Sequence, residues 1–127
     1  MRTEQEGRER GSRVLVVDDD DAIRSVVGDA LREEGYDVCD ARDGREGLAL
    51  LSRFEPDVLV VDLRLPEVDG TVLARKRTGS TEPATVLVSA EPVAGRVAQE
   101  LGVPFIPKPF DIGALIETVD ELASCRR

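Results

Sequence analysis

Two short apolar runs, each ending abruptly at an aspartate, constrain the fold of this chain more than any other feature. Residues 14–17 (VLVV) stop at Asp18, and residues 58–61 (VLVV) stop at Asp62. Runs of this length, rich in β-branched residues and without polar alternation, are typical of strands buried on both faces of a parallel sheet. The sequence therefore predicts two buried strands whose ends carry acids.

Strand and helix patterns alternate along the rest of the chain. The expected strands are residues 14–17, 36–39, 58–61, 85–88 and 103–106, and the expected helices lie within residues 21–34, 43–55, 71–77, 93–101 and 111–122. Asp20 or Asp21 is expected to cap the first helix and Gly35 to end it. Pro104 and Pro107 fit the last strand only at a sheet edge, where a missing N–H costs less. Five such units predict a doubly wound α/β fold, a parallel sheet with helices on both faces.

The length and charge of the chain disfavour several classes of function. The 127 residues suffice for one domain, and no apolar run approaches the ~18 residues that span a membrane. A net charge of −9 disfavours direct binding to nucleic acid or anionic lipid. Residues 1–12 are charged, lack a signal-peptide apolar segment and are expected to form a disordered tail. Because Cys39 and Cys125 suit a reducing compartment and show no metal spacing, the chain is predicted to be cytoplasmic.

Polar residues follow four of the five expected strands. Asp18 and Asp19 follow the first strand, Asp62 the third, Ser89 the fourth and Lys108 the fifth. An open parallel sheet binds ligands beyond the carboxyl ends of its strands, where the winding direction reverses, so these side chains are expected to converge. The absence of histidine excludes a Ser-His-Asp triad and a histidine-ligated zinc site.

Three converging carboxylates call for a cation. At an effective dielectric of ~20, two like charges about 4 Å apart repel by about 4 kcal/mol. Mg²⁺ suits the cluster because it binds one or two carboxylates together with waters and phosphate oxygens. A carboxylate can also attack a phosphoryl group and form an acyl phosphate. Lys108 would then neutralise one phosphoryl oxygen, and the Ser89 hydroxyl would donate to another. The pattern therefore predicts a Mg²⁺-dependent phosphoryl-transfer site.

Four motifs at these strand ends resemble the response-regulator receiver domain of two-component signalling systems. They are residues 14–20 (VLVVDDD), 62–70 (DLRLPEVDG), 88–90 (VSA) and 108–110 (KPF). Each motif alone is weak, whereas all four in this order form a specific combination. The resemblance covers residues 13–124. It implies a single receiver domain with a (βα)5 fold, a flavodoxin-like strand order 2-1-3-4-5 and no output domain.

The resemblance assigns a role to each site residue. It implies that Asp62 is phosphorylated by a partner histidine kinase or histidine phosphotransfer protein, because the chain has no histidine of its own. It places Mg²⁺ on Asp18, Asp19, Asp62 and the backbone carbonyl of Arg64. Lys108 would pair with Asp62 or with its phosphate. Such a chain is no conventional enzyme, because it catalyses only its own phosphorylation and dephosphorylation.

The resemblance also implies a switch and a surface for output. Ser89 would move toward the phosphate while Phe105 turns inward, and the bond between Lys108 and Pro109 would be cis. A downstream protein target is expected to bind the fourth helix, the fifth strand and the fifth helix. Two departures concern this region: the stretch from Ser89 to Lys108 is shorter than is usual in the family, and Phe105 lacks the hydroxyl of the commoner tyrosine.

Two charged residues lie near the predicted mouth of the pocket. Arg64 and Glu91 each follow a site residue by two positions. We hypothesise that they pair across the mouth and limit the access of water to the phosphoryl group. By contrast, Asp69 and Gly70 are interpreted as turn residues, and the basic run 75–77 as a solvated face.

Two other functions fit parts of the pattern. In a phosphohydrolase of the haloacid-dehalogenase type, Asp18 would be the nucleophile and Asp20 the general acid and base. Those enzymes usually need a longer chain and a late acidic pair, which this sequence lacks. The other alternative is a receiver-like binding module that is never phosphorylated, and the complete set of site residues argues against it.

Overall fold

The computed structural model describes residues 11–65, 70–74 and 83–125. Residues 1–10 of the expected tail at 1–12, the turn residue Asp69 and the basic run 75–77 lie outside these ranges, whereas Ser12 at the end of that expected tail is buried. Its strands are β1 (Arg13–Val17), β2 (Asp37–Ala41), β3 (Val58–Asp62), β4 (Ala84–Ser89) and β5 (Phe105–Pro107). Its helices are α2 (Asp21–Glu33), α3 (Gly44–Phe54), α4 (Gly70–Ala74), α5 (Ala94–Leu101) and α6 (Ile112–Cys125). None of the described helices is long and apolar enough to cross a membrane.

The five strands form one parallel sheet in the order β2-β1-β3-β4-β5, which confirms the predicted fold and strand order. The sheet edge is formed on one side by β5, where Pro107 lies beside Ser89 of β4. The expectation that the prolines require an edge strand is therefore confirmed. The order also makes β1 and β3 direct neighbours at the centre of the sheet.

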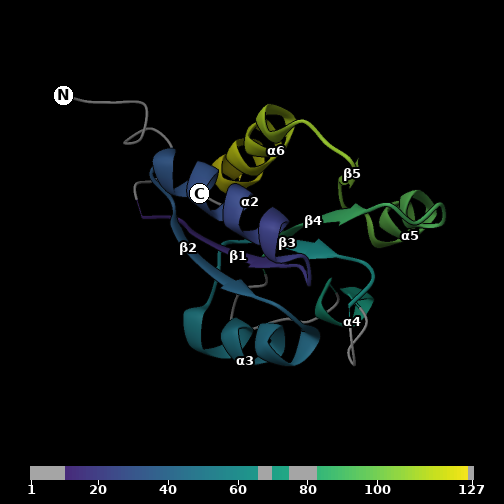
Figure 1. The fold of residues 1–127 in the computed structure, drawn as a ribbon, viewed down its shortest axis with the longest axis horizontal. Coiled ribbons are helices and arrows are strands. Elements are labelled where there is room, and N and C mark those ends of the chain that lie inside the picture. Colours follow the sequence, from purple (N-terminus) through teal and green to yellow (C-terminus); the bar gives the residue numbers. More distant parts are fainter. Residues whose placement is uncertain (1–10, 66–69, 75–82, 126–127) are drawn as a thin grey trace.

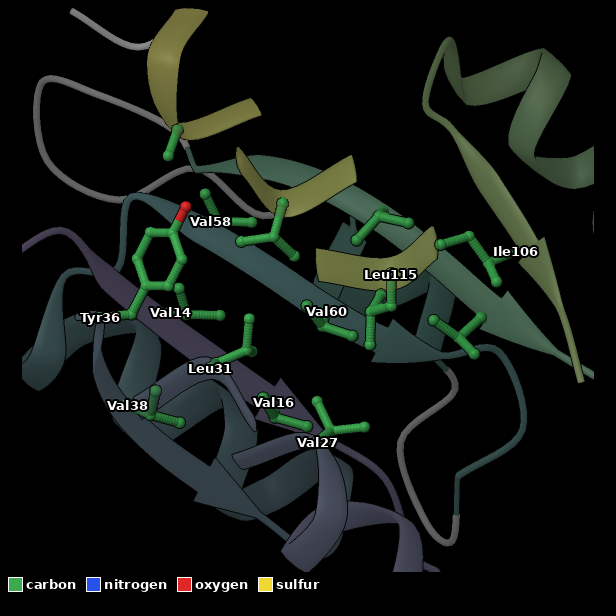
Figure 2. Packing of buried hydrophobic residues seen from close by; sticks show 14 residues of the cluster. Val14, Val16, Val27, Leu31, Tyr36, Val38, Val58, Val60, Ile106 and Leu115 are labelled. Atoms are coloured by element: carbon green, nitrogen blue, oxygen red, sulfur yellow. The ribbon is translucent and has the colours of Figure 1, made fainter. Parts of the chain in front are cut away.

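Helices cover both faces of this sheet (Figure 1). On one face, Val14, Val16, Val58 and Val60 of β1 and β3 pack against α2 and α6, in part through Leu115 of α6 (Figure 2). The intervening residues of the same strands pack on the other face, against side chains of α3, α4 and α5. Because alternate residues of each run are buried on opposite faces, both runs are apolar without interruption.

Local signals set most of the element boundaries. The side chain of Asp20 caps α2 by accepting a hydrogen bond from the amide of Ile23 at 3.1 Å. Gly35, just after that helix, has a φ of 100°, a backbone conformation that glycine adopts without strain. The predicted cap and the predicted stop of this helix are both confirmed.

Two strands begin later than the sequence indicates, for one shared reason. Strand β2 begins at Asp37 because the amide of Tyr36 bonds to the carbonyl of Leu31 at the end of α2. In the same way, the amide of Val103 bonds to Ala98 at the end of α5, and β5 begins only at Phe105. These amides close the preceding helix and are not available to the sheet.

Candidate functional site

The ends of β1 and β3 bring three carboxylates together. Val17 lies beside Val61 in the sheet, so that Asp18 and Asp62 are adjacent at the next position. Asp18, Asp19 and Asp62 each offer a carboxylate oxygen, and these oxygens lie within 4.8 Å of one another. Asp18 and Asp62 are buried, whereas Asp19 is exposed. The predicted convergence of the three acids is present.

Lys108 joins two of these carboxylates from the loop after β5. Its ammonium donates to Oδ2 of Asp18 and to Oδ2 of Asp62, each at 2.8 Å. The loop is held in place because the amide of Lys108 donates to the carbonyl of Ser89 at 3.0 Å. The peptide bond between Lys108 and Pro109 is cis, as the motif resemblance implies.

Backbone amides hold the remaining oxygen of each buried acid. The amide of Asp20 donates to Oδ1 of Asp18 at 2.9 Å, and the amide of Arg64 donates to Oδ1 of Asp62 at 3.0 Å. Each carboxylate is thus fixed on one side by an amide two residues further along the chain and on the other by Lys108. Charged hydrogen bonds of this kind hold the two side chains in a defined orientation.

Burial and charge pull the pKa values at this site in opposite directions. Burial raises the pKa of Asp62, and its hydrogen bonds with Lys108 and with the Arg64 amide only partly offset this effect, so the pKa stays above its usual value. Repulsion from Asp18 adds to the increase. For Lys108, burial lowers the pKa, but its hydrogen bonds to Asp18 and Asp62 outweigh burial and raise it above the ordinary value. Lys108 is therefore a permanent cation at neutral pH.

Ser89 and Phe105 lie on the neighbouring strands. Ser89 follows Val88, the register partner of Asp62, and is buried with 1% of its surface exposed. Its hydroxyl oxygen accepts a hydrogen bond from the amide of Glu91 at 3.0 Å, which leaves the hydroxyl proton available to an acceptor. Phe105, on β5, is half-buried, and its ring lies against Gly95 of α5.

The hypothesised pair at the mouth of the pocket is formed. A guanidinium nitrogen of Arg64, Nη1, lies 2.7 Å from Oε2 of Glu91. The Arg64 side chain is 69% exposed and that of Glu91 is 35% exposed, so the pair lies at the surface of the molecule. Because their backbone amides bond to Asp62 and Ser89, the pair connects the loops that carry these two site residues.

Gly70 is required at this site for a reason that the sequence does not reveal. A Cβ atom at this position would lie 2.1 Å from the backbone carbonyl oxygen of Asp62, far inside contact distance. The amide of Gly70 also donates to the carbonyl of Leu63 at 3.0 Å. The Asp-Gly pair suggests only turn chemistry, whereas the structure shows that glycine permits the close approach of α4 to the end of β3.

A model of the response regulator receiver domain matches residues 14–120 of the chain. The chain belongs to the response-regulator receiver family. Among relatives of this receiver domain, the response regulator MprA of Mycolicibacterium vanbaalenii is 40% identical over an alignment of 108 residues, and the match covers 82% of this chain and 47% of that protein. The response regulator MprA of Mycobacterium leprae is 38% identical, over 87% of this chain and 50% of that protein. The chain thus spans about half the length of the curated relatives that it matches.

A solved structure supports the same assignment. The receiver domain of the Francisella response regulator 1452 superposes on this receiver domain with a TM-score of 0.81 and is 30% identical in sequence. The match covers 92% of this chain and 100% of that one. The family and the fold are therefore established.

Proposed function

We propose that this receiver domain accepts a phosphoryl group on Asp62 from a partner histidine kinase or histidine phosphotransfer protein, with bound Mg²⁺. It would carry the signal onward through contacts with other proteins, and it would act in the cytoplasm. The observation that supports this proposal most strongly is the meeting of Asp18, Asp19 and Asp62 within 4.8 Å, with Lys108 bonded to two of them. This set joins a nucleophile, metal ligands and a fixed cation.

The donor set fits Mg²⁺. Its members are carboxylate oxygens, which this hard cation prefers, and the exposed Asp19 leaves one side of the cluster accessible to solvent. Asp18, Asp19, Asp62 and the backbone carbonyl of Arg64 would hold the ion. When bound, Mg²⁺ neutralises the charge on the phosphoryl oxygens during transfer.

The residues of the chain would divide the remaining tasks. A carboxylate oxygen of Asp62 attacks the phosphorus atom, the new P–O bond forms, and the P–N bond to the donor histidine breaks. Lys108, which already bonds to Asp62, is placed to donate to a phosphoryl oxygen, and the Ser89 hydroxyl would donate to another. Movement of Ser89 toward the phosphate would free space for Phe105 to turn inward, and would alter the surface formed by α5, β5 and α6.

A partner protein must supply the histidine, because the sequence contains none. An apolar groove beside Lys108 offers such a partner a surface. The groove is lined by residues of α2 and of the segment that leads from β5 into α6, among them Ile23, Val26, Phe110 and Ile112. Val26 is 57% exposed, so this part of the groove is open to a partner.

The test is the intact mass of the protein after incubation with acetyl phosphate and Mg²⁺. We expect one added phosphoryl group in the wild type and in Asp20→Asn, and none in Asp62→Asn. Addition that is lost in Asp18→Asn but persists in Asp62→Asn would favour the hydrolase alternative. Failure of the wild type to react with any phosphodonor would favour the binding module.

One contact already weighs against the hydrolase alternative. The side chain of Asp20, its required acid and base, accepts the hydrogen bond that caps α2. That hydrogen bond occupies Oδ1 of the carboxylate at the start of the helix. The receiver function makes no such demand on Asp20.

A further inference from the structure

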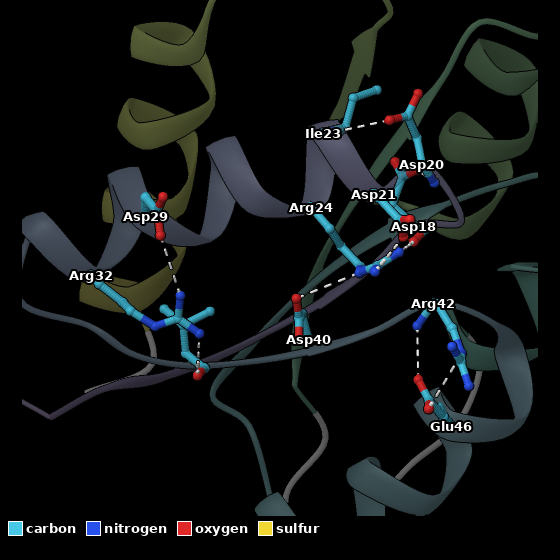
Figure 3. Close-up of polar contacts among 11 residues, drawn as sticks. Asp18, Asp20, Asp21, Ile23, Arg24, Asp29, Arg32, Asp40, Arg42 and Glu46 are labelled. Carbon is cyan, nitrogen blue, oxygen red and sulfur yellow. Dashed lines mark hydrogen bonds and ion pairs between the residues drawn. The ribbon is translucent and has the colours of Figure 1, made fainter.

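One partly buried arginine outside the proposed catalytic set contacts the backbone of the acidic loop. Arg24 is the fourth residue of α2, and only 15% of its side chain is exposed. Its Nη1 donates to the backbone carbonyl of Asp18 at 2.8 Å, and its Nη2 lies 2.6 Å from Oδ1 of Asp21. Its Nε lies 3.5 Å from Oδ2 of Asp40 on β2 (Figure 3). One guanidinium therefore joins the end of β1, the start of α2 and β2.

We infer that Arg24 is a positioning residue for the metal ligands Asp18 and Asp19. The carbonyl that it holds belongs to the peptide group that links these two residues. Fixing the carbonyl oxygen fixes the orientation of this peptide plane, and with it the positions of the two Cα atoms that carry the side chains. The amide on the other side of Asp18 donates to the carbonyl of Ala41 at 3.1 Å. The backbone of Asp18 is thus held at both ends, once by β2 and once by Arg24. This inference rests on the proposed function, because it assigns Asp18 and Asp19 as metal ligands.

Arg24 is suited to this role by its geometry and its charge. A guanidinium donates in several directions within one plane, and here it reaches a carbonyl and two carboxylates, which a lysine ammonium does not match in the same arrangement. Burial lowers the pKa of Arg24, but its interactions with Asp21 and, to a smaller extent, with Asp40 together outweigh this and raise the pKa, so the side chain stays charged.

Two effects of Arg24 on metal binding oppose each other, and this makes the inference testable. As a nearby positive charge, Arg24 repels a cation, so its removal would strengthen Mg²⁺ binding if charge were the dominant effect. As an anchor, it holds the ligands in place, so its removal would weaken Mg²⁺ binding. Because Asp21 and Asp40 already neutralise Arg24, we expect the effect of position to exceed the effect of charge.

The same helix provides a matched control. Arg32 also donates to a backbone carbonyl of β2, that of Val38 at 3.2 Å, and it also pairs with an aspartate three residues earlier, Asp29, at 3.6 Å (Figure 3). No contact of Arg32 reaches the acidic loop among the interactions described for it. A substitution there removes the same kinds of contact from a more exposed side chain, 51% against 15% for Arg24, without the proposed positioning loss.

The experiment is calorimetric titration of Mg²⁺ and of Ca²⁺ into the wild type, Arg24→Lys, Arg24→Gln and Arg32→Lys. Arg24→Lys keeps the charge, so a purely electrostatic role predicts unchanged affinity. The positioning role predicts affinity for Mg²⁺ weakened about tenfold, the lower end of the usual cost of losing a residue that orients metal ligands. Ca²⁺ tolerates irregular geometry and should lose less. Arg24→Gln should likewise lose more affinity for Mg²⁺ than for Ca²⁺. Arg32→Lys should bind both ions with the affinity of the wild type.

Several results would overturn the inference. They are unchanged or tighter Mg²⁺ binding in either Arg24 variant, an equal loss for the two ions, or a comparable loss in Arg32→Lys. Thermal unfolding of each variant, measured without metal, identifies any variant that is not folded. If Arg24→Gln does not fold, the conservative Arg24→Lys variant still allows the test. If the wild type itself binds no Mg²⁺, the proposed function fails, which is a different outcome from failure of the Arg24 assignment.

Discussion

Asp62 is both buried and charged, and these properties conflict. Its carboxylate is 8% exposed and lies beside Asp18, another buried acid, with Lys108 as their shared cation. Burial raises the pKa of Asp62 by more than its two hydrogen bonds lower it, and repulsion from Asp18 adds a smaller increase, so the pKa remains above its usual value. A reactive carboxylate held in this way lowers the stability of the metal-free protein, a common property of functional sites.

The first prediction follows from this pKa. A carboxyl group whose pKa is raised by folding contributes most favourably to stability below its unfolded pKa, and this contribution is lost as the pH rises through the folded pKa. At neutral pH, ionised Asp62 therefore lowers the free energy of unfolding. We expect Asp62→Asn to unfold with a free energy higher by roughly 1 kcal/mol at pH 7 without metal, and the gain to vanish on acidification below pH ~4. Urea unfolding of the wild type and of Asp62→Asn at several pH values measures this difference in the free energy of unfolding. A variant that is less stable than the wild type at pH 7 would contradict the prediction.

The surface pair Arg64–Glu91 calls for a kinetic prediction. An ion pair this exposed contributes at most about 1 kcal/mol to stability, so its expected effect is on access to the site. If the pair limits the entry of water, Arg64→Ala should shorten the lifetime of the phosphoryl group on Asp62 severalfold. Glu91→Ala should shorten it similarly, and the double variant should add little more. The loss of phosphoprotein after removal of the phosphodonor measures the rate, and an unaltered rate in Arg64→Ala would refute the role.

At the scale of elements, the site depends on how closely α4 approaches β3. Gly70→Ala would drive a methyl group into the carbonyl of Asp62, a contact of 2.1 Å with backbone that has no room to move within the sheet. We expect a loss of stability of about 2 kcal/mol or more, together with slower phosphorylation, because the clash displaces the phosphoacceptor. Gly113→Ala is the matched control at an exposed position of α6, where a Cβ would make only an ordinary 3.4 Å contact, and it should stabilise the protein slightly.

The elements also show which structural features can be predicted from sequence. The acids that follow β1 and β3 were predictable because a buried parallel strand that ends in a charged residue leaves that residue at the carboxyl end of the sheet, where ligands bind. Gly70 and Arg24 were not, because each acts on a backbone carbonyl that belongs to another element. No residue type in the sequence marks such a carbonyl. The late starts of β2 and β5 could not be predicted for a similar reason. The sequence does not distinguish a backbone amide that bonds to the end of a helix from one that bonds to a neighbouring strand.

At the scale of the whole molecule, the acidic site exists only in the folded chain. Asp19 and Asp62 are 43 positions apart in the sequence, and the sheet alone brings them within reach of one ion. A ligand that binds only the native state stabilises it by an amount that rises with the logarithm of its concentration, about 2.7 kcal/mol at roughly a hundredfold excess over Kd. For a domain of this size, that corresponds to an increase in Tm of roughly 10 °C.

We therefore expect Mg²⁺ to raise the Tm of the wild type and to have little effect on Asp19→Asn. Mg²⁺ also screens the net charge of −9, which stabilises the fold without a specific site. Two controls separate these effects. NaCl at the same ionic strength reproduces the screening alone, and Asp29→Asn, whose side chain on α2 is 72% exposed, removes one charge outside the cluster. If Asp19→Asn gains as much from Mg²⁺ as Asp29→Asn does, the ion binds elsewhere. If only Asp19→Asn loses the gain, the ion is bound by the acids that the sheet assembles.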